Sequence, residues 1–306
     1  MERRQGGRAC LRNQILPKAK VTANATAASK PPGARSKAGL GTGFFLCYNF
    51  EMNLIHSIFL GVVEGFTEFL PISSTAHLVL TNYFLGNDIT SNFTKVFEIS
   101  IQLGAILSVV VYYFKDLIKW ENMKLLAVGV LPTLVIGFVA KDLVNKLLEL
   151  PVLIAINMIL GGFIILGAEY IYKKRNSKKI EEVDYKQAGI IGVVQSLAMA
   201  PGVSRSGAII VYGLFKNFER EVVAKYAFLL AVPTMAAATG YSILKNREVL
   251  MQNGNFFDLG VGFASAFVVA LIVVKYAIPF IKKYSFAPLG VYRIVIGALL
   301  FISLYK

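Results

Sequence analysis

Two acidic side chains, Glu64 and Glu68, stand four residues apart in an otherwise apolar stretch of the sequence. Residues at this spacing share one face of a helix, so we expect their carboxylates to lie about 6 Å apart. Two carboxylates this close repel each other unless one is protonated or a cation lies between them. The pair therefore indicates a general acid/base pair or a site for a hard divalent cation, Mg²⁺ or Ca²⁺. The alternative interpretation is that both acids line a path for protons.

A cluster of hydroxyl groups follows Pro71, formed by Ser73, Ser74 and Thr75, with His77 close behind. Proline breaks a helix, so these residues are expected to begin a new one, and one hydroxyl is expected to cap it. The free N–H groups at a helix N-terminus bind anions. His77 is interpreted as a general acid/base, against the alternative of a buried structural histidine. The cluster therefore predicts a phosphate site in which Ser73 and Thr75 bind and Ser74 reacts.

A second motif of the same layout lies about 130 residues later: Pro201 and Gly202 are followed by Ser204, Arg205 and Ser206. Arginine offers a planar fork of donors that suits two-point contact with phosphate. Each ionised side chain costs roughly 2.5 to 3.5 kcal/mol at the centre of a membrane helix. Two such motifs at matched positions therefore point to one composite site. Gly202, Ser204 and Ser206 are expected to bind the substrate phosphate beside Arg205.

The composition is that of an integral membrane protein. Hydrophobic residues make up 56% of the 306, the mean hydropathy is +0.60, and charged residues are only 16%, against about 25% in soluble domains. Two histidines are too few for a multi-histidine zinc site, and both cysteines lie within the first 47 residues. The net charge of +14 suits anionic headgroups and an anionic substrate. Nucleic acid is not an expected partner, because the charges flank apolar spans.

The first 51 residues differ from the rest. Residues 1–43 are rich in Arg, Lys, Ala, Gly and Pro without an apolar period, so we expect a disordered basic extension over 1–51. No apolar segment of a secretory signal appears before about residue 44, whereas a transit peptide remains an alternative. We favour a third interpretation, in which translation starts at Met52, where the first membrane element begins. Residues 52–306 are then a single membrane domain.

Apolar runs long enough to cross a membrane occur six times, and each motif lies in a pair of shorter runs. The expected crossings are 97–114, 125–140, 152–172, 226–244, 256–274 and 287–305, and the expected hairpins are 54–70 with 72–85 and 187–200 with 203–215. Helical hairpins of this length are expected to enter the membrane and return, because irregular backbone at depth is tolerated inside protein.

The two halves repeat one another. The segment from Gly61 to Glu64 matches the segment from Gly192 to Gln195, and each half holds one hairpin and three crossings. An odd number of crossings places the halves in opposite orientations, as in many transporters. The predicted fold is an all-α membrane protein with an inverted repeat, about 52–175 and 186–306, each half a re-entrant hairpin plus three transmembrane helices.

Loop charges predict the orientation. One side of the membrane collects fifteen Lys and Arg residues, including the run from Lys173 to Arg175, and the other collects six. By the positive-inside rule the richer side is cytoplasmic. The first hairpin then enters from outside and the second from the cytoplasm, so their tips can meet. Arg293, in the last span, is a weaker site candidate that we expect to pair with an acid such as Glu98.

Taken together, the two motifs closely resemble the undecaprenyl-diphosphate phosphatase family, also called the bacitracin-resistance family. The resemblance covers about residues 52–306. It implies a multi-pass enzyme of the bacterial plasma membrane, with its site opening to the outer face, that removes one phosphate from undecaprenyl diphosphate and so recycles the lipid carrier of peptidoglycan synthesis. The family's functional residues map onto Glu64, Glu68, Ser74, His77 and Arg205. The chain departs from the family pattern at Ala76, usually Gly, and at Ile209, often Thr.

Other functions fit parts of the pattern. A secondary transporter or lipid flippase would also use an inverted repeat with a central polar site, but it would release no phosphate from a prenyl diphosphate. The acid phosphatase superfamily uses Ser, Arg and His too, but it needs a second His with an Asp partner, for which only His56 is left. Membrane lipids and a prenyl diphosphate are the expected partners. The residues leave open whether the protein forms a homo-oligomer.

Overall fold

The computed structural model describes residues 52–87, 89, 91–148, 150–245 and 256–305, and the predicted extension over residues 1–51 lies outside them. These described residues form helices and no β-strand. In chain order the helices are α2 (Leu54–Thr67), α3 (Ser74–Leu85), α4 (Asn92–Tyr112), α5 (Phe114–Leu117), α6 (Trp120–Val139), α7 (Lys141–Leu148), α8 (Pro151–Lys174), α9 (Tyr185–Ser196), the short 3₁₀ helix η1 (Leu197–Met199), α10 (Arg205–Lys216), α11 (Arg220–Lys245), α13 (Phe256–Lys283) and α14 (Ala287–Tyr305).

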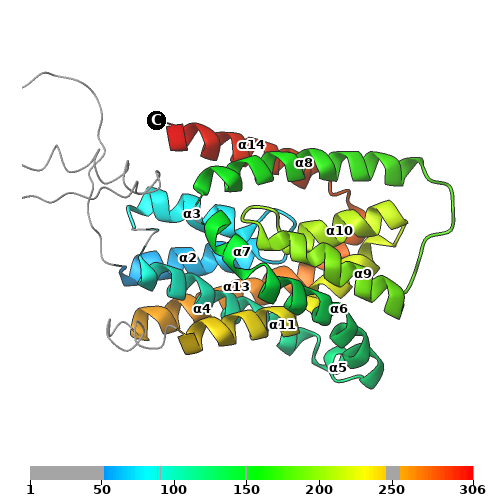
Figure 1. The fold of residues 1–306 in the computed structure, drawn as a ribbon, viewed down its shortest axis with the longest axis horizontal. Helices are drawn as coiled ribbons and strands as arrows, with labels where there is room; N and C mark the ends of the chain where they lie inside the picture. The colour runs from blue at the N-terminus through cyan, green and yellow to red at the C-terminus, as the bar shows by residue number, and fades with distance from the viewer. Residues whose placement is uncertain (1–51, 88, 90, 149, 246–255, 306) are drawn as a thin grey trace, which may run out of the picture. The chain divides into compact units, whose positions relative to one another are not determined.

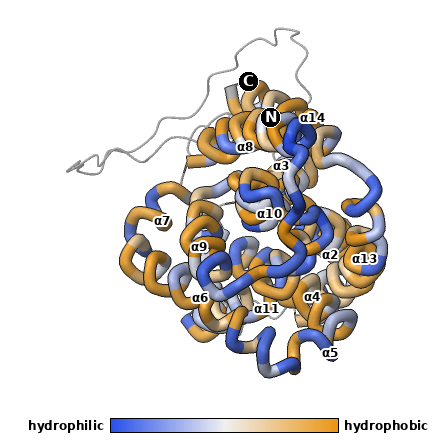
Figure 2. Tube along the Cα trace, turned by 90° about the vertical axis from the view of Figure 1, so that its right-hand side faces the viewer, coloured by the Kyte–Doolittle hydropathy of each residue, from blue (hydrophilic) through white to orange (hydrophobic). Residues whose placement is uncertain are grey.

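Six of these helices are long and apolar enough to cross a membrane, namely α4, α6, α8, α11, α13 and α14. They match the six crossings expected from the sequence, and the all-α membrane fold is confirmed. Hydrophobic residues dominate them, whereas hydrophilic residues gather in the connections (Figure 2). The orientation in the membrane and the inversion of the two halves stay predictions.

Both expected hairpins are present. Helix α2 ends at Thr67, because Pro71 has no N–H to donate and its ring would clash with the carbonyl four residues earlier. The chain resumes as α3 at Ser74, and in the second hairpin α9 and η1 give way to α10 after Pro201. In Figure 1 the pair α2 and α3 lies at the opposite end of the helical domain from α9 and α10, and the two connecting loops approach each other at its centre.

The two loops share an unusual backbone geometry. Ser73 and Ser204, 131 residues apart, both have positive φ angles, of 68° and 71°, just before the helix that each precedes. Side chains other than glycine rarely adopt this region, so each serine holds a locally strained turn. Gly202 has a φ of +88° as well, and a Cβ there would lie 2.5 Å from the carbonyl oxygen of Ile154. The second loop therefore has room only for glycine at that position.

Long helices from one half of the chain hold the hairpin of the other half. Helix α2 packs along α13, and α9 packs along α6, while α8 and α14 form the most extensive helix pair of all. The largest hydrophobic cluster joins Phe69, next to the first loop, to residues of α4, α8, α10, α11 and α13. Each hairpin is thus held by crossing helices of the other half, while part of its surface stays exposed, as at Phe59 and Leu197.

Ion pairs join the ends of the helices on the lysine-rich side. Asp116 in α5 lies 2.9 Å from Lys119 and 2.8 Å from Lys225 of α11. Hydrogen bonds from Lys225 and Lys119 lower the pKa of this carboxyl, so it is charged at neutral pH. Glu169 of α8 accepts from Arg220 of α11 at 2.7 Å and from the backbone N–H of Phe286 at 2.7 Å. These contacts fix the crossings against one another away from the hairpin loops.

Candidate active site

The two hairpin loops meet at the carboxylate of Glu68. One of its oxygens accepts a hydrogen bond from the guanidinium of Arg205, the first residue of α10. The other accepts from the hydroxyl of Ser74, the first residue of α3, at 2.5 Å. Glu68 is 9% exposed and Ser74 is 7% exposed. The structure therefore brings together three of the residues that the sequence singles out, two from the first motif and one from the second.

Glu64 lies one turn before Glu68 and is completely buried. Neither of its carboxylate oxygens has a hydrogen-bond partner within the described part of the chain, whereas Glu68 has two donors. A buried carboxylate without a donor is stable only when it is protonated or when a cation lies beside it. The two oxygens without a donor, beside a second carboxylate and a cluster of hydroxyls, therefore fit a hard divalent cation, and they equally fit a shared proton.

His77 is held in one tautomer. Its Nδ1 lies 2.8 Å from the carbonyl oxygen of Ser73, and because a carbonyl can only accept, Nδ1 carries the proton. Its Nε2 lies 2.8 Å from the hydroxyl of Tyr292 in α14, and the two rings stack at 5.6 Å. In the neutral ring Nε2 is then the acceptor and Tyr292 the donor. The hydroxyl of Ser74 thus pairs with Glu68, and His77 pairs with Tyr292.

The remaining hydroxyls surround the meeting point. The Oγ of Ser204 accepts from the backbone N–H of Gly207 at 3.1 Å and so caps α10, whereas Ser73 makes no such cap. Ser206 donates to the carbonyl oxygen of Leu70 at 3.0 Å, which joins the second hairpin directly to the first loop. Thr75 is half-buried in the first turn of α3. The prediction that a hydroxyl of the first motif caps its helix is therefore wrong, and the side-chain cap is found in the second motif instead.

Arg293 of α14 connects both loops from the side. It is fully buried, and its guanidinium donates to five backbone carbonyl oxygens at 2.9 to 3.4 Å. These oxygens belong to Pro71 in the first loop, to Gly202 and Val203 in the second, and to Asn157 and Met158 in α8.

The expectation that Arg293 pairs with Glu98 is wrong. Glu98 accepts from the side chain of Asn82 at 2.7 Å, and every hydrogen bond of Arg293 to the described residues goes to backbone. A guanidinium that holds turns need not be near an acid, because backbone carbonyls that the loop leaves without an N–H donor supply the acceptors. Tyr292 was missed entirely, since a lone tyrosine in an apolar span carries no motif. Asn157, which donates to the carbonyl oxygen of Pro201 at 2.8 Å, was missed for the same reason.

The two departures from the family pattern lie in the core. Ala76 packs with Ile154, Ala155 and Met158 of α8, and Ile209 packs in a second cluster with Leu230. Both side chains are fully buried. An alanine and an isoleucine are therefore accommodated by packing against neighbouring helices at these positions.

Known proteins with the same pattern share most of this chain. The family model described as "Bacitracin resistance protein BacA" matches residues 57–299. An undecaprenyl-diphosphatase of Campylobacter jejuni is 46% identical over 259 residues, which is 83% of this chain and 96% of the relative. Undecaprenyl-diphosphatases of a Sulfurihydrogenibium species and of Bdellovibrio bacteriovorus are each 43% identical, over 82% and 83% of this chain and 99% and 97% of their own. Because the match runs through both hairpins and all six crossings, the chain belongs to the bacitracin resistance protein BacA family.

Proposed function

We propose that this protein hydrolyses undecaprenyl diphosphate to undecaprenyl phosphate and inorganic phosphate, and so recycles the lipid carrier of cell-wall synthesis. The observation that carries the proposal is the joint contact of Glu68 with Ser74 and Arg205, buried where two membrane hairpins meet. A hydroxyl bound to a carboxylate can be deprotonated, and the neighbouring guanidinium suits a phosphate. The excess of positive charge on one side supports a plasma-membrane protein whose site opens to the outer face.

The proposed reaction proceeds in two balanced steps. The Oγ of Ser74 bonds to the terminal phosphorus as its proton moves to Glu68, and the bond from that phosphorus to the bridging oxygen breaks, releasing the lipid monophosphate. Water then attacks the phosphorus of the phosphoserine and the bond from that phosphorus to Oγ breaks. One water proton passes to Oγ, the other leaves with the inorganic phosphate, and Glu68 releases to solvent the proton that it took in the first step. Arg205 neutralises charge on the transferred group, since phosphoryl transfer gains chiefly from positioning and charge. His77, with its Nε2 turned to Tyr292, is the alternative nucleophile, and direct attack by water is the third.

The function is tested with purified protein in detergent. Release of inorganic phosphate from undecaprenyl diphosphate, at a rate proportional to protein concentration, is the expected result. A transporter or flippase acting on the same lipid would give no phosphate. The same assay on the Glu68→Gln variant, purified in the same way, controls for a contaminating phosphatase. The activity of a contaminant would be unaffected by the substitution.

Substitutions at Ser74 and His77 separate the nucleophiles. We expect Ser74→Ala to lower kcat by at least about 10³-fold, because an enzyme that loses its nucleophile loses most of its rate enhancement. A phosphoenzyme trapped by acid quench should be found in the wild type and be absent from Ser74→Ala, with Ser73→Ala as the matched control. Near-normal turnover of Ser74→Ala together with an inactive His77→Ala would instead make His77 the nucleophile.

A divalent cation is proposed at the carboxylate pair, where Glu64 and Glu68 would hold it beside the loop hydroxyls. When bound, Mg²⁺ or Ca²⁺ would neutralise charge on the phosphate oxygens and on the two carboxylates. We expect EDTA to abolish phosphate release and either cation to restore it. Glu64→Gln should raise the cation concentration needed for half-maximal activity, because Gln is a weaker ligand than carboxylate.

The two carboxylates are expected to differ in their importance. Glu68→Gln should be the more damaging substitution, since Glu68 alone contacts both Ser74 and Arg205. The second half of the chain already carries Gln195 at the position that matches Glu64. Full activity in excess chelator would contradict the cation and leave Glu64 as a proton carrier.

A further inference from the structure

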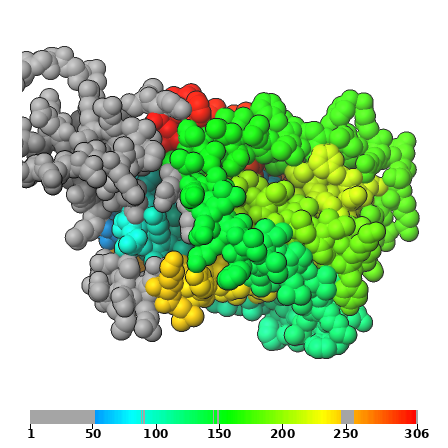
Figure 3. All heavy atoms as spheres, in the orientation of Figure 1, coloured from blue at the N-terminus to red at the C-terminus, as the bar shows by residue number. Residues whose placement is uncertain are grey.

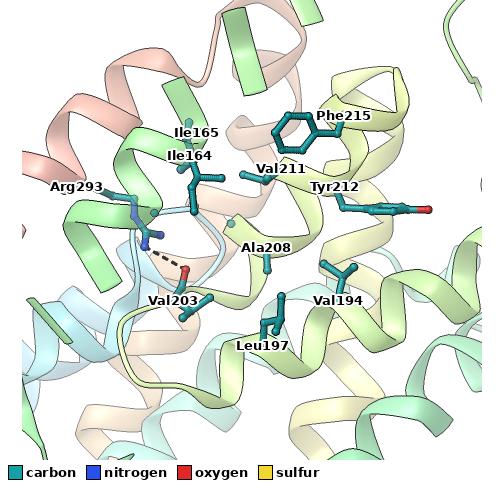
Figure 4. A pocket seen from close by; sticks show the side chains of 12 residues that line it. Ile164, Ile165, Val194, Leu197, Val203, Ala208, Val211, Tyr212, Phe215 and Arg293 are labelled. Carbon is teal, nitrogen blue, oxygen red and sulfur yellow. Dashed lines mark hydrogen bonds between the residues drawn. The ribbon is translucent and has the colours of Figure 1, made fainter. Parts of the chain in front are cut away.

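An apolar groove extends away from the phosphate motif along one side of α10. Its cavity of about 280 Å³ lies between α8, α9 and α10. Figure 4 shows Arg293 and Val203 at one end and Tyr212 and Phe215 at the other, with Ile164 and Leu197 on facing walls. On the face seen in Figure 3, α8 adjoins the second hairpin. Ile164 is 50% exposed and Leu197 64%, so the groove is open toward lipid.

The groove begins at the phosphate motif itself. The α10 residues that line it include Ala208, Val211 and Phe215, spaced by three and four residues along one face. Ser204 stands one turn before Ala208 at the head of the same stripe, next to Arg205. From Ser204 to Phe215 the helix rises about 16 Å at 1.5 Å per residue. The groove therefore starts at Val203 and Gly207, on either side of the segment from Ser204 to Ser206, and runs along α10.

The head of the groove is cationic. At its head lies the guanidinium of Arg293, whose hydrogen bonds in the described part of the chain go to backbone carbonyls rather than to a carboxylate. Aliphatic side chains form its walls, and the aromatic rings of Tyr212 and Phe215 stand at its far end, where Arg175 donates to the carbonyl oxygen of Phe215 at 2.6 Å. A cationic head and an apolar body complement a ligand with an anionic end and a hydrocarbon chain.

We propose that this groove binds the first isoprene units of the lipid substrate, while the diphosphate occupies the loops. This deepens the proposed function, on which it rests, by giving the hydrocarbon chain its own binding site. The chain would run from Ser204 toward Phe215, away from the face to which the phosphate site is proposed to open. A lipid whose headgroup faces the outer surface has its hydrocarbon chain pointing in this direction. Binding energy from the chain would then hold the reacting phosphorus in place.

The test compares substitutions that fill the groove with one that does not. Ile164→Trp and Leu197→Trp narrow it from opposite walls without touching the phosphate loops, and Ile272→Trp on α13 is the matched control at a similarly exposed isoleucine (54%). We expect the first two to raise KM for undecaprenyl diphosphate by about tenfold or more, since excluding a few methylenes loses that much binding. Their kcat/KM for isopentenyl diphosphate, which has one isoprene unit, should stay within about twofold of the wild type.

The outcomes are distinguishable from failure of the proposed function. An equal loss of kcat/KM on both substrates would overturn the groove as the binding site of the hydrocarbon chain. An unchanged KM for undecaprenyl diphosphate would overturn it as well. A prenyl diphosphate with a diazirine near the diphosphate should label residues 161–165 or 203–215, and unlabelled undecaprenyl diphosphate should compete. Labelling elsewhere, or labelling of the groove without competition, would assign the groove to bulk lipid and overturn the proposal. Labelling does not need turnover, so it reads out the groove even if no phosphate is released.

Discussion

Replacement of Arg205 by alanine should lower kcat for phosphate release by about 10²- to 10³-fold, the loss typical when one preorganised donor to a developing charge is removed. The structure gives a second reason for a large effect. Arg205 is the partner of Glu68, so its loss leaves a buried carboxylate without its cation and disturbs the acceptor of the Ser74 proton. Arg205→Lys keeps the charge but loses the planar fork, so it should recover part of the loss. Steady-state kinetics at saturating lipid give the comparison.

A double-mutant cycle decides whether Arg205 and Glu68 act as a unit. If they do, Arg205→Ala combined with Glu68→Gln should be little worse than the more damaging single variant, because each change already breaks the same assembly. Losses that multiply would contradict the shared role and assign the two residues to independent steps. Unfolding temperatures in detergent provide the control, since a merely unstable variant would lose protein rather than turnover.

Replacement of Arg293 by methionine should be as damaging, although this side chain contacts none of the proposed reacting groups. Methionine has a similar length, but it would leave the loop carbonyl oxygens of Pro71, Gly202 and Val203 without the guanidinium donor, each at a cost of about 1 to 3 kcal/mol. We expect a marked fall in unfolding temperature and a fall in kcat of about 10²-fold or more, because misplacement by about 1 Å has effects of this size. Arg175→Met, which removes a single bond to a backbone carbonyl, is the matched control.

Gly161 gives an independent check on Arg293. A Cβ at this position would lie 2.3 Å from the guanidinium, so Gly161→Ala should displace Arg293 without removing a charge or a donor. Its effect on kcat should be in the same direction as that of Arg293→Met and smaller. Wild-type turnover in Gly161→Ala would show that the loops tolerate movement of the guanidinium, and Arg293 would then be required for stability alone.

Much of this arrangement was predictable from the sequence. The long apolar runs set the six crossings, and Pro71 and Pro201 fixed the positions of the hairpin loops, because the physical effect of proline on a helix is local. That the two motifs form one site followed from their repeat, although the direct contact of Glu68 with Arg205 was not predicted. The contacts of His77 and Arg293 were not predicted either, since both depend on how α14 packs against loops 90 or more residues away in the chain. Such contacts are set by tertiary packing, which no local pattern encodes.

The meeting of two short hairpins also has a consequence for the permeability barrier of the membrane. Helices of 14 and 12 residues, such as α2 and α10, rise only about 21 and 18 Å, so neither alone crosses a core of about 30 Å. In the predicted arrangement, with the hairpins entering from opposite faces, the barrier along this line depends on polar contacts between the two loops, where Ser206 donates to Leu70 and Arg293 donates to both backbones. Substitutions that break these contacts should let water and ions leak across the bilayer. The position of the site therefore also matters for the ion gradients that store energy across the membrane.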